Sequence, residues 1–460
     1  MFILAIHTPP FFRFLHSITS KHLNFLKIKL FYKFVNILDD HTVCAISAYP
    51  KRILLVHGVE EMYSMINGLP VLRVKVLPKK STSIRIPAYH VVWQGPVKRT
   101  SGLGIACKEY VKALRRQGVN TSVIEIQGRA GGLSNNRKVL IYHYPPNTIN
   151  LRKERKQYDT IIINTVWETT RIPKRWINPI NQSDAVFVPS RQNRQAMRDS
   201  GIRTPIFIVP HGVDAKMFVP MNKQLPSKKA NRPFTFISVF GFQHRKNPEG
   251  LLKAYWEEFS SSDNVRLIIK TNGYAAYEND RWIRSRIQFY KAKLGIRKST
   301  APIQIIARHI NTKSLRSIYA QGHAFVLPTR GEGIGLPFLE SMASGVPVIT
   351  TGWGGHMDFL SSHNSFLVQY KLRPPVIGMN RRTSISRQFR HLFSEKGQLW
   401  AEPDIGSLKR QMRKAYENPR LCITKGRQAR LDALKLSWNR SGSLLKQAIE
   451  KTIAAVPTRK

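Results

Sequence analysis

Acidic residues and cysteine are both scarce in this sequence. Of 460 residues, 27 are Asp or Glu and 74 are Lys or Arg, so the formal net charge is +47. The three cysteines, Cys44, Cys107 and Cys422, are too few and too scattered for a disulfide framework or a Cys-based zinc site. A reduced, cytoplasmic compartment is therefore the default expectation.

Long apolar runs are missing as well. No window reaches the roughly 18 uninterrupted apolar residues of a membrane-spanning helix. The apolar start is broken by Pro9 and Pro10, and it lacks the charge order and cleavage site of a secretory signal. Residues 21–38 alternate lysines with apolar residues, a pattern that allows a basic amphipathic helix on a membrane surface. The competing interpretation, which we favour, is an upstream extension of the real domain.

The charge alone does not identify a function. A charge of +47 attracts polyanions such as nucleic acid, anionic lipid or phosphorylated ligands, but a basic-biased proteome gives the same composition. With 42% apolar and 22% charged residues the chain has an ordinary globular mixture, which excludes wholesale disorder. No aromatic-basic RNA motif, zinc site or recognition helix is visible.

Strand–turn–helix units alternate from about residue 86, stop at a stretch with three prolines, and then restart. Alternation of this kind predicts parallel sheets with crossover helices, here an α/β chain of two Rossmann-like domains that face each other across a cleft. The expected divisions are a basic, aromatic-rich extension of uncertain structure at 1–85, an amino-terminal domain at 86–216, a linker at 217–233, a carboxyl-terminal domain at 234–436, and a terminal helix at 437–460 that packs back on the amino-terminal domain.

The segment 326–355, VLPTRGEGIGLPFLESMASGVPVITTGWGG, concentrates the residues that carry chemistry. Pro337 suits the first position of a helix and Gly345 suits its end. Glu332 then lies in a glycine-rich loop and Glu340 on the helix, eight residues apart. Loop glycines allow main-chain N–H groups to approach a ligand, and a helix N-terminus favours an anion. Carboxylates beside such a site are suited to accept hydrogen bonds from sugar and ribose hydroxyls.

Two further turns have the composition of anion sites. In FGFQHRKNP, Asn247 can cap a helix that begins at Pro248, which leaves Arg245 and Lys246 at its N-terminus. Cations there oppose the helix dipole, so a bound diphosphate would compensate. The turn GPVKRTSGLG, which contains Gly102 and Gly104, lies between a strand and a helix and is a weaker signal.

In combination these segments resemble the group 1 (family 4) retaining glycosyltransferases over roughly residues 89–440. The segment 326–355 resembles the family's nucleotide-sugar segment. HRKNPEGLLKAYWEEF resembles its donor-phosphate helix, TSGLGIACKEYVKALRRQG its glycine loop, and VPHGVD the end of its first domain. WETTRIPKRW resembles a WETTRIP-type subset of the family. The resemblance implies a GT-B fold whose carboxyl-terminal domain binds most of the donor.

The resemblance also implies roles for single residues. Arg245 and Lys246 would bind the donor diphosphate, Glu332 would contact the donor sugar and Glu340 would hold the ribose. Gly102 and Gly104 would let the amino-terminal loop close on the donor. Main-chain groups would surround the sugar and phosphate at Gly333, Ile334, Gly335 and Leu336.

Two departures from the family pattern concern catalysis. Many members have an Arg about six residues before the Lys, where this chain has Phe240. Many also have a His after a strand of the first domain, where this chain has Glu168. Glu168 or His143 could serve beside Glu332 at the reacting carbon, and His309–Ile310 is a weaker candidate for the nucleotide base.

The expected function is therefore transfer of a sugar from a nucleoside diphosphate sugar to a hydroxyl of a glycan, a lipid-linked sugar or another acceptor. The sequence contains no Asp-x-Asp triad of the kind that binds a metal–diphosphate complex, so we expect metal-independent transfer without a cofactor. The resemblance implies that the transfer is retaining. We expect no specific nucleic acid partner, and a cytoplasmic location with peripheral contact to the anionic inner face of the membrane. An inactive GT-B scaffold and a polyanion-binding protein are the alternatives.

Overall fold

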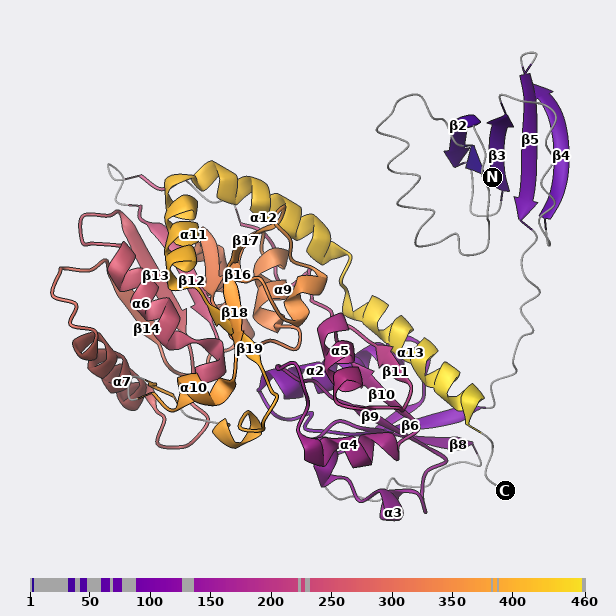
Figure 1. Ribbon diagram of the computed structural model, residues 1–460, viewed down its shortest axis with the longest axis horizontal. Helices are drawn as coiled ribbons and strands as arrows, with labels where there is room; N and C mark the ends of the chain where they lie inside the picture. Colours follow the sequence, from indigo (N-terminus) through magenta and orange to yellow (C-terminus); the bar gives the residue numbers. More distant parts are fainter. Residues whose placement is uncertain are drawn as a thin grey trace. The chain divides into compact units, whose positions relative to one another are not determined.

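The chain consists of two compact units, Met1–Arg85 and Ile86–Lys460. In the computed structural model (Figure 1) the described residues are 2–3, 32–37, 42–47, 59–66, 69–76, 88–125, 136–221, 225–227, 232–381, 384–386 and 389–456. Within these residues, no helix combines the length and the hydropathy needed to cross a membrane.

The described part of the first unit is a five-stranded sheet in the order β1-β2-β3-β5-β4. Its strands are β1 Phe2–Ile3, β2 Tyr32–Ile37, β3 Thr42–Ser47, β4 Val59–Ile66 and β5 Leu69–Val76. Strand β2 corrects the helical interpretation of residues 21–38, of which 21–31 lie outside the described residues. The β2 sequence, YKFVNI, is rich in aromatic and β-branched residues, and the strand pairs antiparallel with β3.

The amino-terminal half of the second unit is a parallel sheet of six strands in the order β11-β10-β9-β8-β6-β7. Its strands are β6 Tyr89–Gln94, β7 Thr121–Ile124, β8 Arg137–Tyr142, β9 Thr160–Asn164, β10 Ala185–Val188 and β11 Ile206–Ile208. Its helices are α2 Gly102–Arg116, α3 Leu151–Glu154, α4 Lys174–Asn181 and α5 Arg191–Asp199. The predicted alternation of strands and helices is confirmed here, whereas α3 and α4 were not expected.

The carboxyl-terminal half repeats this plan with the order β14-β13-β12-β15-β16-β17. Its strands are β12 Phe234–Val239, β13 Val265–Lys270, β14 Ile303–Ile306, β15 Ala324–Leu327, β16 Val348–Thr351 and β17 Ser365–Val368. Its helices are α6 Pro248–Glu258, α7 Asp280–Lys293, α8 Thr312–Gln321, α9 Leu336–Ala343, α10 Pro375–Met379, α11 Ile405–Glu417 and α12 Pro419–Leu434. A short ladder of β18 Tyr370–Arg373 and β19 Trp400–Pro403 is added beside α10.

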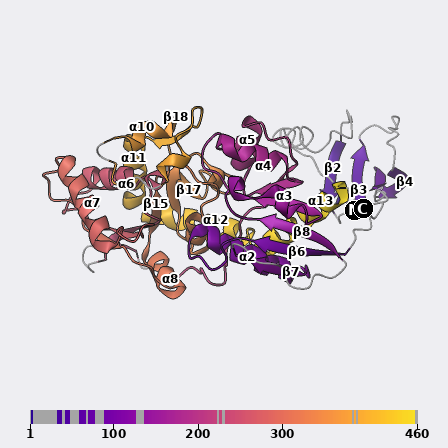
Figure 2. The same ribbon diagram turned by 90° about the horizontal axis from the view of Figure 1, so that it is seen from below.

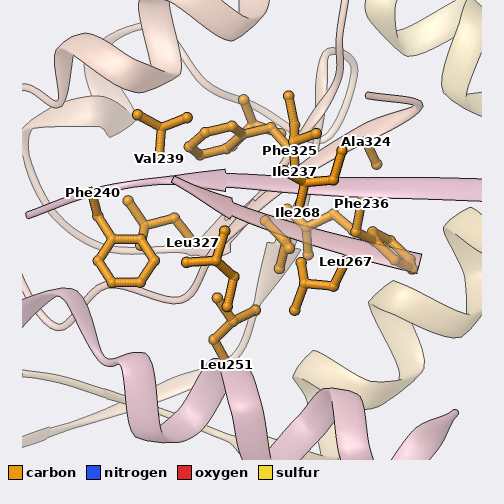
Figure 3. Close-up of a cluster of buried hydrophobic side chains, with 14 of the residues drawn as sticks. Phe236, Ile237, Val239, Phe240, Leu251, Leu267, Ile268, Ala324, Phe325 and Leu327 are labelled. Atoms are coloured by element: carbon orange, nitrogen blue, oxygen red, sulfur yellow. The ribbon is translucent and has the colours of Figure 1, made fainter. Parts of the chain in front are cut away.

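Apolar side chains explain why the central strands of this half are buried on both faces. All six residues of β12 are buried, as expected for a parallel sheet covered by helices on each side. Figure 3 shows Phe236 and Ile237 of β12 among Leu267 and Ile268 of β13 and Phe325 of β15. This core fixes the strand ends from which the loops of the candidate site emerge.

Both sheets reverse their strand order at one point, and the candidate site lies at these two points. In the first sheet the reversal falls between β6 and β8, and in the second between β12 and β15. Loops that leave the carboxyl ends of neighbouring strands diverge there and leave a crevice in open parallel sheets. The glycine-rich turns predicted as anion sites follow β6, β12 and β15.

The last helix of the chain, α13 Trp438–Ala455, packs on the amino-terminal half (Figures 1 and 2). Its Trp438, Leu445 and Ile449 share a core with residues of α2 and of the first sheet. Gly442 allows the two helices to approach, because a Cβ there would lie 2.7 Å from the Ala113 carbonyl oxygen. The second unit thus ends with a helix that packs on its own amino-terminal half.

A second close approach fixes the start of α13. The Val213 N–H donates to the Leu436 carbonyl (2.8 Å), and a Cβ on Gly212 would lie 2.2 Å from the backbone nitrogen of Trp438. The contact is between backbone atoms, so rotation of a side chain cannot make room for a larger residue at position 212.

Gly212→Ala is therefore expected to lower the free energy of unfolding by about 2 kcal/mol, because the segment must move away from α13. Urea denaturation followed by tryptophan fluorescence measures the change. Gly102→Ala is the matched control, since a Cβ at Gly102 would meet no atom within 4 Å. Equal free energies of unfolding for the two variants would contradict the close contact between Gly212 and the start of α13.

Candidate active site

A cavity of about 300 Å³ is lined by loops from both halves of the second unit. From the amino-terminal half come the start of α2 and the residues that follow β8, β9, β10 and β11. From the carboxyl-terminal half come the loops after β12, β13 and β15 and the start of α9. The predicted residues that line it are Gly102, His143, Glu168, Arg245, Lys246, Glu332, Gly333, Ile334, Gly335 and Leu336.

Local sequence explains the position of the two cations. Asn247 adopts a left-handed conformation (φ 58°) and accepts a hydrogen bond from the Gly250 N–H, so it caps α6 as predicted. Its amide also donates to the Pro328 carbonyl (3.0 Å), which ties the cap to the loop after β15. Arg245 and Lys246 belong to a single 3₁₀ turn just before this cap, at the cavity wall.

The loop after β9 places Glu168 at the same cavity. Trp167 is buried, and its backbone N–H donates to Asn193 Oδ1 (2.6 Å) while its indole N–H donates to Thr169 Oγ1 (2.6 Å). The Thr170 N–H donates to the Leu399 carbonyl in the other half (2.9 Å). Glu168 therefore stands between two anchored neighbours.

Four ionisable side chains meet at the centre of the cavity wall. Lys246 Nζ donates to Glu332 Oε1 (2.5 Å), and Arg245 Nη1 lies 3.3 Å from Glu332 Oε2. Arg245 Nη2 lies 3.3 Å from Glu168 Oε1, so this guanidinium links the two halves of the unit. The group of Arg245, Lys246, Glu168 and Glu332, called the charge cluster below, is formally neutral.

Burial and neighbouring charges shift the pKa values of the cluster. Burial alone would raise the pKa of Glu332, but Lys246 and Arg245 outweigh it and hold the pKa at about 2. Burial raises the pKa of Glu168, with Arg245 opposing the shift, and lowers the pKa of Lys246, with Glu332 opposing it. The cluster is therefore anionic at Glu332, and its cations are available to another anion.

The loop glycines have a role that the sequence interpretation did not include. A Cβ on Gly331 would lie 2.1 Å from the Glu168 carbonyl oxygen, and one on Gly333 would lie 1.9 Å from Val166 Cγ2. These glycines therefore allow the two halves to touch, besides any approach to a ligand. At Gly335 the φ of 83° favours glycine, and the helix α9 begins at the next residue.

Three predicted positions do not line the cavity. Gly104 packs beneath the turn before α2, where a Cβ would lie 2.1 Å from the Arg99 carbonyl oxygen. His309 is exposed after β14. Glu340 lies on α9, where Tyr319 of α8 donates to its Oε2 (2.8 Å), and burial raises its pKa to about 7.

Other cavity residues were not predicted from the sequence. They include Tyr110, Asn164, His211 and Tyr274. His211 belongs to the VPHGVD segment, which was noted only as the end of a domain; its position just after β11 was an available signal. Among the described residues, no three His, Cys, Asp or Glu side chains are grouped so that they could hold a metal ion.

The raised pKa of Glu340 predicts a pH dependence of stability. The folded chain keeps this proton up to about pH 7, whereas the unfolded chain releases it near the ordinary value of 4.5. The free energy of unfolding therefore falls as the pH rises from about 4.5 to 7. Urea denaturation at several pH values should show this fall in the native chain and a smaller one in Glu340→Gln. The control Glu109→Gln, on the exposed side of α2, should behave like the native chain; identical slopes in all three would refute the assignment.

The sequence of the carboxyl-terminal half matches a known protein family. Residues 232–373 match the sequence profile of the family described as glycosyl transferases group 1. The chain is 26% identical to alpha-monoglucosyldiacylglycerol synthase of Streptococcus pneumoniae over 38% of each chain. It is 26% identical to the lipopolysaccharide core biosynthesis mannosyltransferase LpsB of Rhizobium meliloti, over 40% of this chain and 49% of that one. The chain thus spans less than half the length of these curated relatives.

Solved structures agree on the fold. Sucrose-phosphate synthase from Thermosynechococcus elongatus has a TM-score of 0.58 at 14% identity, over 80% of this chain and 99% of that one. The Anabaena protein HepE in complex with UDP and glucose has a TM-score of 0.55 at 10% identity, over 79% and 99%. The two Rossmann-like halves of this chain therefore have the GT-B fold, and its residues 232–373 form a glycosyl transferases group 1 domain.

Proposed function

We propose that this protein is a glycosyltransferase that moves a sugar from a nucleoside diphosphate sugar to an acceptor hydroxyl. The observation that carries the proposal is the charge cluster: two cations and two carboxylates, all buried or largely buried, line one cavity at the points where the two sheets reverse their strand order. A diphosphate next to a sugar has the charge and the hydroxyls that this arrangement can bind.

The cations would neutralise the leaving group. Arg245 and Lys246 both lie close to the carboxylate oxygens of Glu332. The oxygens of a diphosphate in the cavity can replace this carboxylate as acceptors of hydrogen bonds from the two cations. Charge developing on the leaving oxygens is then stabilised by fixed cations, which need no reorganisation during the reaction. We propose metal-independent transfer without a cofactor, because the cations can do the work that a divalent ion does elsewhere.

Glu332 would bind the sugar. The carboxylate of Glu332, ionised because Lys246 and Arg245 lower its pKa, accepts hydrogen bonds from the hydroxyls of the donor sugar. We further propose retention. The C1–O bond to the diphosphate breaks, the acceptor oxygen bonds to C1 on the same face, and the acceptor proton passes to the leaving diphosphate oxygen. Contact between the halves at Gly331 and Gly333 would exclude water from this step.

We propose a glycan or a lipid-linked sugar as acceptor, with no specific nucleic acid partner. The relatives named above are called a diacylglycerol glycolipid synthase and a lipopolysaccharide core transferase, and synthesis of a cell-envelope polysaccharide or glycolipid would suit a chain of net charge +47. A cytoplasmic protein with this charge would contact the anionic inner face of the membrane. Co-sedimentation with phosphatidylglycerol vesicles, and not with phosphatidylcholine vesicles, measures that contact.

A panel of radiolabelled nucleotide sugars tests the donor site. One donor of the panel should raise the melting temperature of the protein and lose its sugar to water or to an added acceptor. Lys246→Ala should weaken the binding of that donor by about tenfold to a hundredfold, the usual effect of losing a hydrogen bond to a charged group. Glu332→Ala should reduce transfer more than it reduces nucleotide binding.

Lys253→Ala is the matched control, since Lys253 lies on α6, the helix that follows Lys246, and pairs with Glu257, not with a cavity residue. The proposal fails if no donor is bound, hydrolysed or transferred, or if Lys246→Ala binds the donor as tightly as the native chain. Binding without any turnover would favour an inactive scaffold.

A further inference from the structure

The two walls of the cavity differ in charge. The cations, Arg245 and Lys246, come from the carboxyl-terminal half, as does Glu332. On the amino-terminal wall the only charged lining residue within the described part of the chain is Glu168, which Arg245 already pairs. The remaining polar groups of that wall include two histidines and an asparagine. An anion is therefore favoured on one wall, and an uncharged polar ligand on the other.

His143 follows β8 and is oriented by its neighbours. Its side chain is 3% exposed, and the amide Nδ2 of Asn164 donates to its Nδ1 (3.2 Å). Because Nδ1 accepts, the neutral ring carries its proton on Nε2. The edge of the ring also packs against Trp93, at a centroid distance of 5.5 Å. Asn164 of the cavity wall thus sets the tautomer, and Trp93 supports the ring from outside the cavity.

His211 is held from the opposite side by the last helix. Its ring stacks on Trp438 of α13 (5.7 Å between centroids) and meets Tyr110 edge to face (5.5 Å). The next residue, Gly212, lies against the backbone of Trp438. Nδ1 of His211 is buried and has no hydrogen-bond partner within the described chain. Since Nδ1 is closed off, the nitrogen of this wall residue that a ligand in the cavity can reach is Nε2, which has no hydrogen-bond partner among the described residues either.

We infer that His211, together with His143, binds the attacking hydroxyl of an uncharged acceptor and positions it toward the donor held by Arg245 and Lys246. This inference rests on the proposed function, which it deepens by assigning the acceptor end of the cavity. Its chemical class is a neutral hydroxyl compound, such as a sugar or a polyol, with no phosphate or carboxylate next to the reacting hydroxyl.

The environment keeps both rings uncharged. Burial lowers the pKa of His211 to about 3, and burial together with the neighbouring His211 lowers the pKa of His143 to about 3. Neutral imidazoles donate or accept a hydrogen bond without attracting an anion, so they suit a hydroxyl group. Rings with such low proton affinity are weak bases, so their role is to position the hydroxyl rather than to remove its proton.

The test uses the donor that the nucleotide-sugar panel identifies, with water and glycerol as neutral acceptors. His211→Phe keeps an aromatic ring between Tyr110 and Trp438 but removes both nitrogens. We expect it to slow transfer to water and to glycerol by at least about tenfold, with donor binding unchanged. His211→Gln, which restores a hydrogen-bonding group, should recover part of the rate. The native enzyme should prefer glycerol to sn-glycerol 3-phosphate.

His90→Phe is the matched control. His90 lies on β6, in the sheet of the amino-terminal half that also contains β11. It forms a hydrogen bond with Ser122 (2.8 Å between Nε2 and Oγ) and does not line the cavity. The inference is overturned if folded His211→Phe transfers to water and glycerol at the native rate, or if glycerol 3-phosphate is the better acceptor. If the native chain binds no donor at all, the proposed function fails first, and the donor-binding measurement reveals this separately.

Discussion

The contact of Arg245 with two carboxylates is the interaction on which the second unit depends most. Glu168 belongs to one half of the unit and Glu332 to the other, and one guanidinium lies 3.3 Å from an oxygen of each. Removing four ionisable groups from water is costly, and a buried ion pair often stabilises a fold no more than apolar residues would. Their position at a cavity is therefore the feature on which the proposed donor site rests. A diphosphate that binds Arg245 competes with Glu168, so occupancy of the cavity and contact between the halves are coupled.

A second arginine supports this centre from behind. Arg330 forms a two-point pair with Glu402 of β19 (2.7 and 3.0 Å) and donates through Nη1 to the His244 carbonyl (2.6 Å). Its backbone N–H donates to the Arg245 carbonyl (2.8 Å). The loop that contains Glu332 and the turn that contains Arg245 are thus fastened to each other and to the added ladder β18–β19. This bracing explains how short loops can hold like charges side by side.

Local chemistry made much of the site predictable. Asn247 as a cap, Gly345 after a helix, and the neighbouring cations each depend on a few adjacent residues, and the structure places them as the sequence indicates. The pairing of Arg245 with Glu168 joins residues far apart in the chain, so no local pattern reports it. The position of His211 just after a strand was the one local signal for it, whereas its ring partners, Tyr110 and Trp438, lie in distant helices and left no pattern in the sequence. The helix considered as one possibility for residues 21–38 is contradicted at β2, since pairing with another strand overrides a weak amphipathic pattern.

The return of α13 to the amino-terminal half has a consequence for synthesis on the ribosome. The first sheet of the second unit is complete in sequence at Ile208, but its core lacks Trp438, Leu445 and Ile449 until the final helix has been made. During translation this half exposes the apolar face of α2 while more than two hundred further residues emerge, since α13 begins at Trp438. Domains generally fold as they appear, and exposed apolar surface favours aggregation. Emergence of α13 is therefore the event that allows the amino-terminal half, and His211 with it, to reach its final packing.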